Sequence, residues 1–218
     1  MDYERIRDFI ISYCHDDCGI LQEIYDEALK DEVPIIRRDA KNLLQVMLRM
    51  IKPKRILEVG TAIGYSTLVM ADTLNDIYRE CNDWHITTLE LDETRCRQAQ
   101  TNFDKSSFSR RISLIRGDAA DSLDLLEGQF DLVFIDAAKA QYMVYLEKCM
   151  KLVRSGTVIL TDNILSDGDV LESHFLVEKR DRTIHDRMRE YVYKIKNDER
   201  LDTAILSVGD GIAVSVVR

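Results

Sequence analysis

Two stretches of the sequence decide the fold: Phe-Asp-Leu-Val-Phe-Ile-Asp-Ala-Ala-Lys at residues 130–139 and Thr-Val-Ile-Leu-Thr-Asp-Asn at residues 157–163. In each stretch an apolar run with the composition of a strand gives way to polar residues. A helix is expected between them, over residues 140–152, so the two strands should be parallel neighbours joined by a right-handed crossover. Polar residues that follow parallel strands gather at one edge of the sheet, where α/β proteins build their sites.

The alternation of strands and helices extends beyond this unit. Apolar runs bounded by turn residues predict strands at 55–59, 85–91, 112–116, 132–135 and 157–160. The apolar periodicity predicts helices near 65–76, 93–104, 119–126 and 140–152. Such alternation is typical of a parallel sheet with helices on both faces.

Both ends of the chain depart from this pattern. Residues 1–52 have the apolar spacing of helices, and a helix at 181–197 is followed by two strands at 202–207 and 211–217. We therefore predict an α/β fold: a doubly wound seven-stranded sheet with an antiparallel C-terminal hairpin and extra N-terminal helices. No change of composition marks a second domain, so residues 1–218 are predicted to form one domain, with a helical extension at 1–52 and a core at 53–218.

The composition is that of a globular protein, with 45% hydrophobic residues among 218. No apolar run approaches the roughly 20 residues of a membrane helix, and no signal peptide is visible. Five scattered cysteines favour reduced thiols and a cytoplasmic location, and Cys14-His15-x-x-Cys18 lacks the second ligand pair of a zinc site. The net charge of −9 argues against general coating by nucleic acid but allows a local basic patch.

Polar side chains follow the two deciding strands. Asp136 and Lys139 follow the first strand, and Asp162 and Asn163 follow the second. Three hard oxygen ligands at one sheet edge suit Mg²⁺, which leaves coordination positions for water or substrate. The alternatives are ordinary turn and cap roles for the acids, and a salt bridge from Lys139 to Asp136 or Asp162. Lys139 is otherwise the candidate base.

A glycine loop follows the first predicted strand, in Glu58-Val-Gly60-Thr-Ala-Ile-Gly64-Tyr-Ser66. Glycines there allow a ligand to approach the backbone at a helix N-terminus. The loop lacks the third glycine of a dinucleotide fingerprint, and its acid, Glu90, ends the next strand, where a carboxylate can accept both ribose hydroxyls. Glu58 suits an ammonium-bearing ligand better than a phosphate. S-adenosylmethionine, a zwitterion with an added sulfonium, matches this pattern, and a purely structural glycine turn is the alternative.

At these residues the chain resembles the class I S-adenosylmethionine-dependent methyltransferases, specifically the metal-dependent O-methyltransferases of the catechol and caffeoyl-CoA type. The resemblance runs from about Val33 to the C-terminus. It rests on the motifs E-V-G-T-x-x-G-Y-S at 58–66, L-E at 89–90, G-D-A at 117–119, F-I-D-A-A-K at 134–139 and T-D-N at 161–163.

The resemblance implies a role for each motif. Glu90 would bind the ribose hydroxyls, and Asp118 with Ala119 would contact the adenine. Lys139 would be the base, with Asp136 as the second catalytic residue. The full set implied for the cofactor is Glu58, Gly60, Gly64, Ser66, Glu90, Asp118, Ala119 and Asp136, and the set implied for Mg²⁺ or another divalent cation is Asp136, Asp162 and Asn163.

Within the family the chain resembles the bacterial tRNA 5-hydroxyuridine methyltransferases, which make 5-methoxyuridine at the wobble position. The likeness rests on D-A-A-K-x-Q-Y at 136–142, a basic stretch near 179–189 and V-G-D-G-x-A at 208–213. It implies a tRNA partner and, together with the N-terminal helices, a homodimer. The alternatives are a small catechol-like or caffeoyl-type acceptor and a non-catalytic S-adenosylmethionine-binding protein. The candidate phosphate contacts, interrupted by Asp181 and Asp186, are Lys179, Arg180, Arg182, Arg187 and Arg189.

Overall fold

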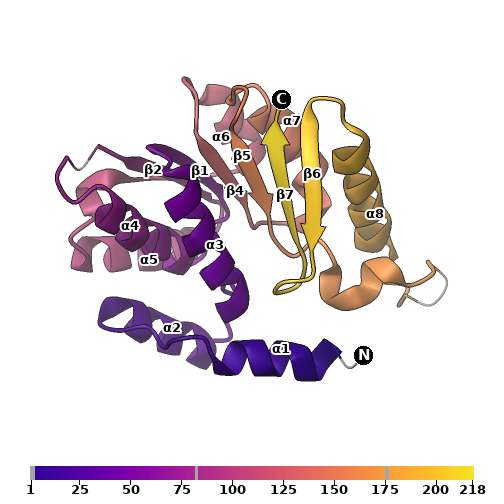
Figure 1. Ribbon diagram of the computed structural model, residues 1–218, viewed down its shortest axis with the longest axis horizontal. Helices are drawn as coiled ribbons and strands as arrows, with labels where there is room; N and C mark the ends of the chain where they lie inside the picture. The colour runs from indigo at the N-terminus through magenta and orange to yellow at the C-terminus, as the bar shows by residue number, and fades with distance from the viewer. Residues whose placement is uncertain (1–2, 82, 175–176) are drawn as a thin grey trace.

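A seven-stranded sheet forms the centre of the computed structural model, which describes residues 3–81, 83–174 and 177–218. The strands lie in the order β3-β2-β1-β4-β5-β7-β6, as Figure 1 shows. β1 to β5 run parallel, β7 is antiparallel to β5, and β6 is antiparallel to β7. This topology confirms the predicted fold class. The strands are β1 Arg55–Val59, β2 His85–Glu90, β3 Ile112–Arg116, β4 Leu132–Ile135, β5 Val158–Thr161, β6 Leu201–Leu206 and β7 Ile212–Val217.

Eight α-helices and three short 3-10 helices belong to the described residues. Three of the α-helices precede the sheet, as the sequence predicts for residues 1–52. They are α1 Tyr3–Ser12, α2 Ile20–Lys30 and α3 Arg38–Ile51; the others are α4 Tyr65–Ile77, α5 Glu93–Lys105, α6 Ala119–Leu125, α7 Tyr142–Cys149 and α8 Arg182–Asn197. The 3-10 helices are η1 Ser109–Arg111, η2 Lys139–Gln141 and η3 Ser166–Leu171. None of the helices among these residues has the length and apolar content needed to cross a membrane.

The sheet is buried on both faces because its central strands are apolar throughout. In β1, Ile56 packs into a core that includes side chains of α3, α4 and α5, while the next residue, Leu57, packs into a second core with α6, α7 and α8. Alternate residues of a strand point to opposite faces, so one apolar run supplies both cores. Helices therefore cover both faces of the sheet, as doubly wound folds require.

Most predicted boundaries agree with the structure to within one residue. The largest difference concerns the helix expected near 140–152, which is divided into the 3-10 turn η2 and the shorter α7. The end of α7 tightens because the Leu152 amide donates to the Cys149 carbonyl, a bond across three residues. The break before α7 leaves Lys139 on the turn that follows β4, at the carboxyl edge of the sheet.

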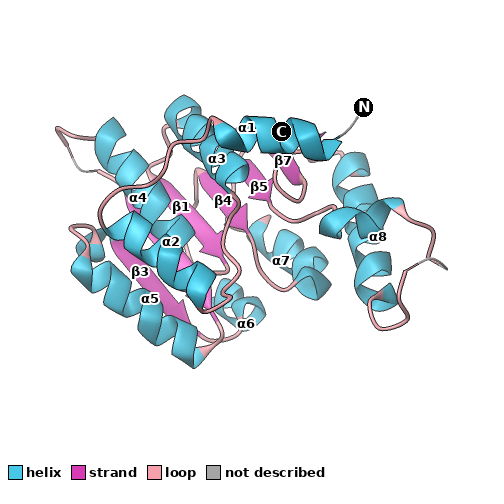
Figure 2. Ribbon diagram, turned by 90° about the horizontal axis from the view of Figure 1, so that it is seen from below, coloured by secondary structure: helices cyan, strands magenta, loops and turns pink. Residues whose placement is uncertain are grey.

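The N-terminal helices lie at the edge where the parallel strands end. Figure 1 shows α1 and α2 beyond this edge, and Figure 2, turned by 90°, shows α2 lying across it. The loop between α2 and α3, residues Pro34–Arg37, faces the loops that follow β1, β2 and β4 across a cavity. The predicted helical extension thus forms one wall of the candidate site.

Candidate active site

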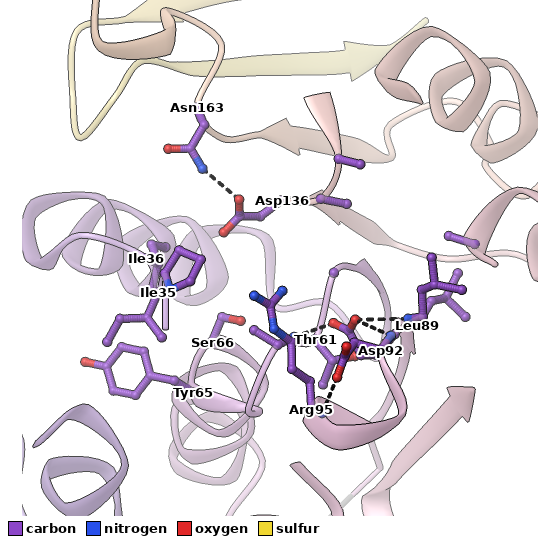
Figure 3. A pocket seen from close by; sticks show the side chains of 18 of the residues that line it. Ile35, Ile36, Thr61, Tyr65, Ser66, Leu89, Asp92, Arg95, Asp136 and Asn163 are labelled. Atoms are coloured by element: carbon purple, nitrogen blue, oxygen red, sulfur yellow. Dashed lines mark hydrogen bonds between the residues drawn. The ribbon is translucent and has the colours of Figure 1, made fainter. Parts of the chain in front are cut away.

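A cavity of about 870 Å³ lies between these loops. Its lining comes from the ends of β1, β2 and β4, from the β3–α6 and β5–η3 connections, and from the β6–β7 turn (Figure 3). Carboxyl ends of neighbouring parallel strands meet here, as the two deciding stretches predict. Glu90 and Asp118 line one end of the cavity, and Asp136 and Asn163 line the other. After the roles that the resemblance implies, we call them the cofactor end and the acceptor end.

The glycine loop is shaped by a close backbone contact. Gly60 has φ +105°, and a Cβ atom there would lie 1.9 Å from the carbonyl oxygen of Asp136. Gly64, with φ +89°, begins α4 and would place a Cβ atom 2.5 Å from the ring of Phe103. Both positions exclude a side chain by sterics as well as by backbone conformation. The loop after β1 can therefore touch the loop after β4 only because residue 60 is glycine.

Glu58 lies beneath this loop and is fully buried. Its carboxylate accepts hydrogen bonds from the hydroxyls of Ser66 (2.6 Å), Thr88 (2.6 Å) and Thr67. Burial nevertheless raises the pKa of Glu58 to about 7, since the hydroxyls only partly replace water. Ser66 lines the cavity, whereas Glu58 is not among the described lining residues. The structure thus places Glu58 behind Ser66, where it accepts the hydrogen bond of that hydroxyl and fixes the position of its oxygen.

Glu90 is held by the backbone on both of its carboxylate oxygens. One oxygen accepts from the Ala62 amide at 2.8 Å, and the other accepts from the Leu91 and Asp92 amides at 3.0 and 2.9 Å. A carboxylate can accept about four hydrogen bonds, so acceptor capacity remains for a ligand in the cavity. This is the arrangement expected of a group that receives ribose hydroxyls. The fixed backbone donors place the oxygens before a ligand arrives.

The β3–α6 connection supplies the rest of the cofactor end. Asp118 is the N-cap of α6 and accepts from the Ala120 amide at 2.7 Å, and Asp118 and Ala119 both line the cavity. Sequence reasoning did not single out Arg95, which lines the cavity near Asp92 (Figure 3). Arg95 stands in the first turn of α5, where its amide donates to Asp92 and where a surface charge is the ordinary expectation.

At the acceptor end, the structure brings together the three predicted metal ligands. The side-chain nitrogen of Asn163, Nδ2, donates to Asp136 Oδ1 at 2.7 Å (Figure 3). The backbone amide of Asn163 donates to Asp162 Oδ1, also at 2.7 Å. Asn163 adopts φ +59°, which turns its side chain back toward β4. Register explains the approach, because Ile135 pairs with Thr161, the residue before Asp162.

The electrostatics of this end favour a cation. Burial raises the pKa of Asp136. Burial, and next the charge of Asp136, raises the pKa of Asp162 to about 7. Two carboxylates with raised pKa values can both ionise at little cost when a divalent cation lies between them. A half-turn of the Asn163 amide would present its oxygen beside Asp136, so the donor set fits a hard cation such as Mg²⁺.

Lys139 reaches the same end from η2, but its partner differs from those considered in the sequence. Its Nζ lies 3.4 Å from Oδ2 of Asp210, a nearly buried residue of the β6–β7 turn. The Gly209 amide of this turn donates to Asp39 at the start of α3, at 2.9 Å. Asp210 also lines the cavity. Val208-Gly-Asp-Gly211 served in the sequence prediction as part of a family motif between two strands, with no role for Asp210, and only the tertiary structure places this acid in the site.

The predicted basic stretch is partly used inside the protein. Arg180 pairs with Glu178 and Asp181, at 3.0 and 3.3 Å. Arg187 donates to the Ala140 carbonyl at 3.0 Å. The others are Lys179, which is exposed, Arg182, which donates to the Val177 carbonyl at 3.1 Å, and Arg189, which donates to the carbonyls of Val170 and Glu172 at 3.4 and 3.1 Å.

The two tyrosines that follow η2 have different surroundings. Tyr142 is buried, and its hydroxyl donates to the Asp162 carbonyl at 3.0 Å. Tyr145 lines the cavity near Asp118, and burial raises its pKa. Core packing is thus the role of Tyr142, while Tyr145 remains available for contact with a bound ring.

Comparisons with known proteins agree with this geometry. The sequence profile of the O-methyltransferase family matches residues 12–217. A catechol O-methyltransferase of Niastella koreensis is 33% identical over 184 residues, which cover 80% of this chain and 78% of the relative. A caffeoyl-CoA O-methyltransferase of Stellaria longipes is 34% identical over 182 residues, which cover 79% and 72%.

Solved structures show the same fold. The SAH-bound methyltransferase PaMTH1 of Podospora anserina superposes with a TM-score of 0.86 at 26% identity, over 99% of this chain and 95% of that one. An O-methyltransferase of Bacillus cereus in complex with SAH gives 0.82 at 25% identity, over 98% and 97%. The chain therefore belongs to the O-methyltransferase family, of the catechol and caffeoyl-CoA type. Its enzyme class is S-adenosylmethionine-dependent O-methyl transfer.

Proposed function

We propose that this protein transfers the methyl group of S-adenosylmethionine, in a Mg²⁺-dependent reaction, to a hydroxyl that stands beside a second oxygen. The observation that supports this most strongly is the convergence of Asp136, Asn163 and Lys139 in the cavity that also holds Glu90, with buried Asp162 bonded to the backbone amide of Asn163. Two adjacent oxygens can chelate one cation, and few acceptors other than vicinal diols and their analogues offer them.

The cofactor end fits the parts of S-adenosylmethionine in sequence. Glu90 receives the ribose hydroxyls on oxygens already fixed by backbone amides. Asp118 and Ala119 lie where an adenine would follow. Ser66 and the backbone at Gly60 face the methionine part, with Glu58 behind Ser66. The sulfonium then stands at the middle of the cavity, between the two ends.

The acceptor end would hold Mg²⁺ on Asp136, Asp162 and Asn163. When bound, the cation lowers the pKa of a chelated hydroxyl and fixes the orientation of the two acceptor oxygens. Lys139 would first release a proton to solvent and would then accept the proton of that hydroxyl as a neutral amine, while Asp210 holds Nζ in place. The acceptor oxygen forms its bond to the methyl carbon as the carbon–sulfur bond breaks. Alignment of the two reactants supplies much of the rate, and no enzyme nucleophile is needed.

We propose 5-hydroxyuridine at the tRNA wobble position as the acceptor, because its O5 and O4 are adjacent oxygens. Support comes from Arg187, which is bonded to Ala140 in the same turn as Lys139, and from Arg189, two residues further along α8. Backbone carbonyls carry no net charge, so these hydrogen bonds do not offset the positive charges of the two guanidinium groups. Together with exposed Lys179, they would contact phosphates and give a salt-dependent affinity.

A small catechol-like or caffeoyl-type compound is the second candidate acceptor. The observation that favours it is the similarity of this chain to proteins described as catechol and caffeoyl-CoA O-methyltransferases. Internal pairing of Arg180 with two acids also weakens the basic surface. Both acceptors would use the same chelating site, so only the surface around the cavity separates them.

The test is methyl transfer from labelled S-adenosylmethionine to tRNA that contains 5-hydroxyuridine and, in parallel, to a panel of catechols, each with Mg²⁺ or with EDTA. Label in tRNA, lost with EDTA and mapped to the wobble uridine, supports the tRNA acceptor. Label only in catechols moves the protein to small-molecule methylation. Undiminished transfer with EDTA would contradict the role proposed for Mg²⁺.

Charge variants separate the two acceptors further. The triple variant K179Q/R187Q/R189Q should weaken tRNA methylation at least about tenfold at moderate salt and reduce its salt dependence, while catechol methylation stays unchanged. The matched control lies at the amino edge of the sheet: K54Q/K151Q/R154Q. Equal losses in both triples would show that net charge, rather than the surface near Lys139, governs binding.

We also propose that two copies associate through α1. Two apolar side chains of this helix, Phe9 (63%) and Ile10 (49%), are exposed, and so is Tyr13 (72%), which follows the helix. A second copy could bury this face together with its own. Light scattering of the wild type and of the variant Phe9→Glu tests this, since the variant should be a monomer.

A further inference from the structure

A cluster of two histidines and one aspartate lies outside the cavity, where α8 begins. His185 is in the first turn of α8, Asp186 follows it, and His174 is in the segment after η3. One oxygen, Asp186 Oδ1, lies 2.8 Å from His174 Nδ1 and 3.1 Å from His185 Nδ1. The potential ligand atoms of all three residues lie within 4.8 Å of one another. Nothing in the proposed methyl transfer uses these groups.

The two ring nitrogens of His185 have different partners. In the neutral ring, the nitrogen that faces the Asp186 carboxylate carries no proton. Its Nε2 lies 3.2 Å from the carbonyl oxygen of Glu172. A carbonyl only accepts, so Nε2 must carry the proton. In the neutral ring Nδ1 then bears a lone pair that faces Asp186 Oδ1. Either a second proton or a cation has to lie between these two atoms.

The position of His185 suits a metal ligand. Its side chain is only 1% exposed, so its ring is held in a fixed orientation. A metal ion would use the lone pair on Nδ1, while the Nε2 proton stays on a backbone carbonyl. That is the usual arrangement of metal-bound histidines.

We propose that His174, His185 and Asp186 form a binding site for a divalent transition-metal ion of the zinc type. Nitrogen and oxygen ligands at about 2.0–2.2 Å in a tetrahedron stand about 3.3 Å apart. The two nitrogen–oxygen distances are within about 0.5 Å of that value, and a small movement of His174 would close the remaining edge. His174 and Asp186 are 41% and 56% exposed, so a water molecule can complete the tetrahedron from the solvent side.

The site would join the segment after η3 to α8. Arg189 already binds the carbonyls of Val170, in η3, and of Glu172, and His185 binds the carbonyl of Glu172. His174 is already bonded to Asp186, and a metal ion would hold this bond and His185 together. Its ligand set differs from that of the acceptor end, because imidazole nitrogens select zinc, cobalt and nickel over magnesium.

The experiment is a titration of the metal-free protein with Zn²⁺ and with Co²⁺, in excess Mg²⁺ to fill the oxygen site. We expect one Zn²⁺ per chain and, at free Zn²⁺ about 100 times its Kd, a rise in melting temperature of about 5–10 °C. Co²⁺ should give the visible spectrum of a four-coordinate site without thiolate charge transfer, which excludes Cys14 and Cys18 as ligands. His174→Ala and Asp186→Asn should each weaken Zn²⁺ binding at least about tenfold.

His15→Ala is the matched control, since His15 is an exposed histidine far from α8 in the sequence. It should bind Zn²⁺ as the wild type does. The proposal fails if the wild type binds no Zn²⁺, or if His174→Ala binds it as tightly while His15→Ala does not. His174 is in a solvent-facing segment, so its variant should fold, and circular dichroism of the metal-free protein checks this. Because methyl transfer is measured separately, failure here leaves the proposed function untouched.

Discussion

The two ends of the cavity hold their carboxylates in opposite ways. At the cofactor end, Glu90 accepts three backbone hydrogen bonds, from amides of two loops. At the acceptor end, Asp136 and Asp162 lie close together, with Asn163 as their nearest donor, and the pKa values of both are raised. The cofactor end is thus prepared for hydroxyl groups without further help. The acceptor end has an excess of negative charge that a cation would offset.

The largest expected effect comes from removing one charge at the acceptor end. Asp136→Asn keeps the size of the side chain but removes a negative charge from the metal site, and we expect kcat to fall by about 10⁴-fold, since a bound cation supplies several kcal/mol. S-adenosylmethionine affinity should change by less than about tenfold if the two ends are independent. Turnover assays and calorimetry measure the two quantities.

Asp121→Asn, an exposed acid on α6, is the control for this comparison. A loss of cofactor affinity as large as the loss of turnover would show that the two ends form one unit.

Lys139→Met should lower kcat by about 10²–10³-fold, as loss of a general base does. The effect should shrink as pH rises, because hydroxide can replace the base and a larger fraction of the chelated hydroxyl is already ionised. Asp210→Asn should reproduce part of this loss, since it removes the partner 3.4 Å from Nζ. Stopped assays over a pH series measure both. If kcat of Lys139→Met keeps the wild-type pH profile, Lys139 serves only as a fixed charge.

Glu58 gives the cofactor end a pH-dependent stability. Its folded pKa of about 7 exceeds its ordinary value of 4.5, so folding favours the protonated form. The stabilisation is complete below pH 4.5 and is lost as pH rises through 7. In the cofactor-free wild type, Glu58 should lower the free energy of unfolding by about 2–3 kcal/mol between about pH 5 and 8. Glu58→Gln should remove this decrease.

Urea unfolding at the two pH values measures this difference. The raised pKa of Asp162 should also lower the free energy of unfolding as pH rises, and this decrease should remain in the Glu58 variant. An unchanged slope in Glu58→Gln would mean that its hydroxyl partners already keep Glu58 ionised.

The smallest effect is expected at Glu90. Glu90→Gln retains the shape of the side chain but replaces one oxygen with an NH2 group that cannot accept from a backbone amide, so the Kd of S-adenosylmethionine should rise by about tenfold. kcat at saturating cofactor should change little, because the chemistry takes place at the other end. Calorimetry with exposed Glu80→Gln as control measures it. A change in kcat larger than the change in Kd would contradict the division of the cavity.

The fold could be predicted because its causes are local. Apolar runs such as Leu132–Ile135 are buried on both faces, and their flanking glycines and acids mark the strand ends. The residues of the candidate site could be located for the same reason, since Asp136 and Asp162 end adjacent parallel strands. Their roles in binding and catalysis stay predictions.

What could not be predicted depends on contacts between distant segments. Asp210 enters the site because its turn docks on α3 through Asp39, and no local pattern records this. The position of Glu58 behind Ser66 depends on which face of β1 meets α4. Likewise, the sequence alone could not show whether the guanidinium group of Arg187 is solvated or bonded to a backbone carbonyl.

The docking of the β6–β7 turn also bears on how the protein is made. Ala62 and Glu90, which define the cofactor end, are 28 residues apart, whereas Lys139 and Asp210 are 71 apart, and Asp39 and Gly209 are 170 apart. During synthesis on the ribosome, the cofactor end can close while later strands are still being added. The acceptor end acquires Asp210 only when β7 begins to form. A growing chain could therefore hold its methyl donor before it has the means to use it.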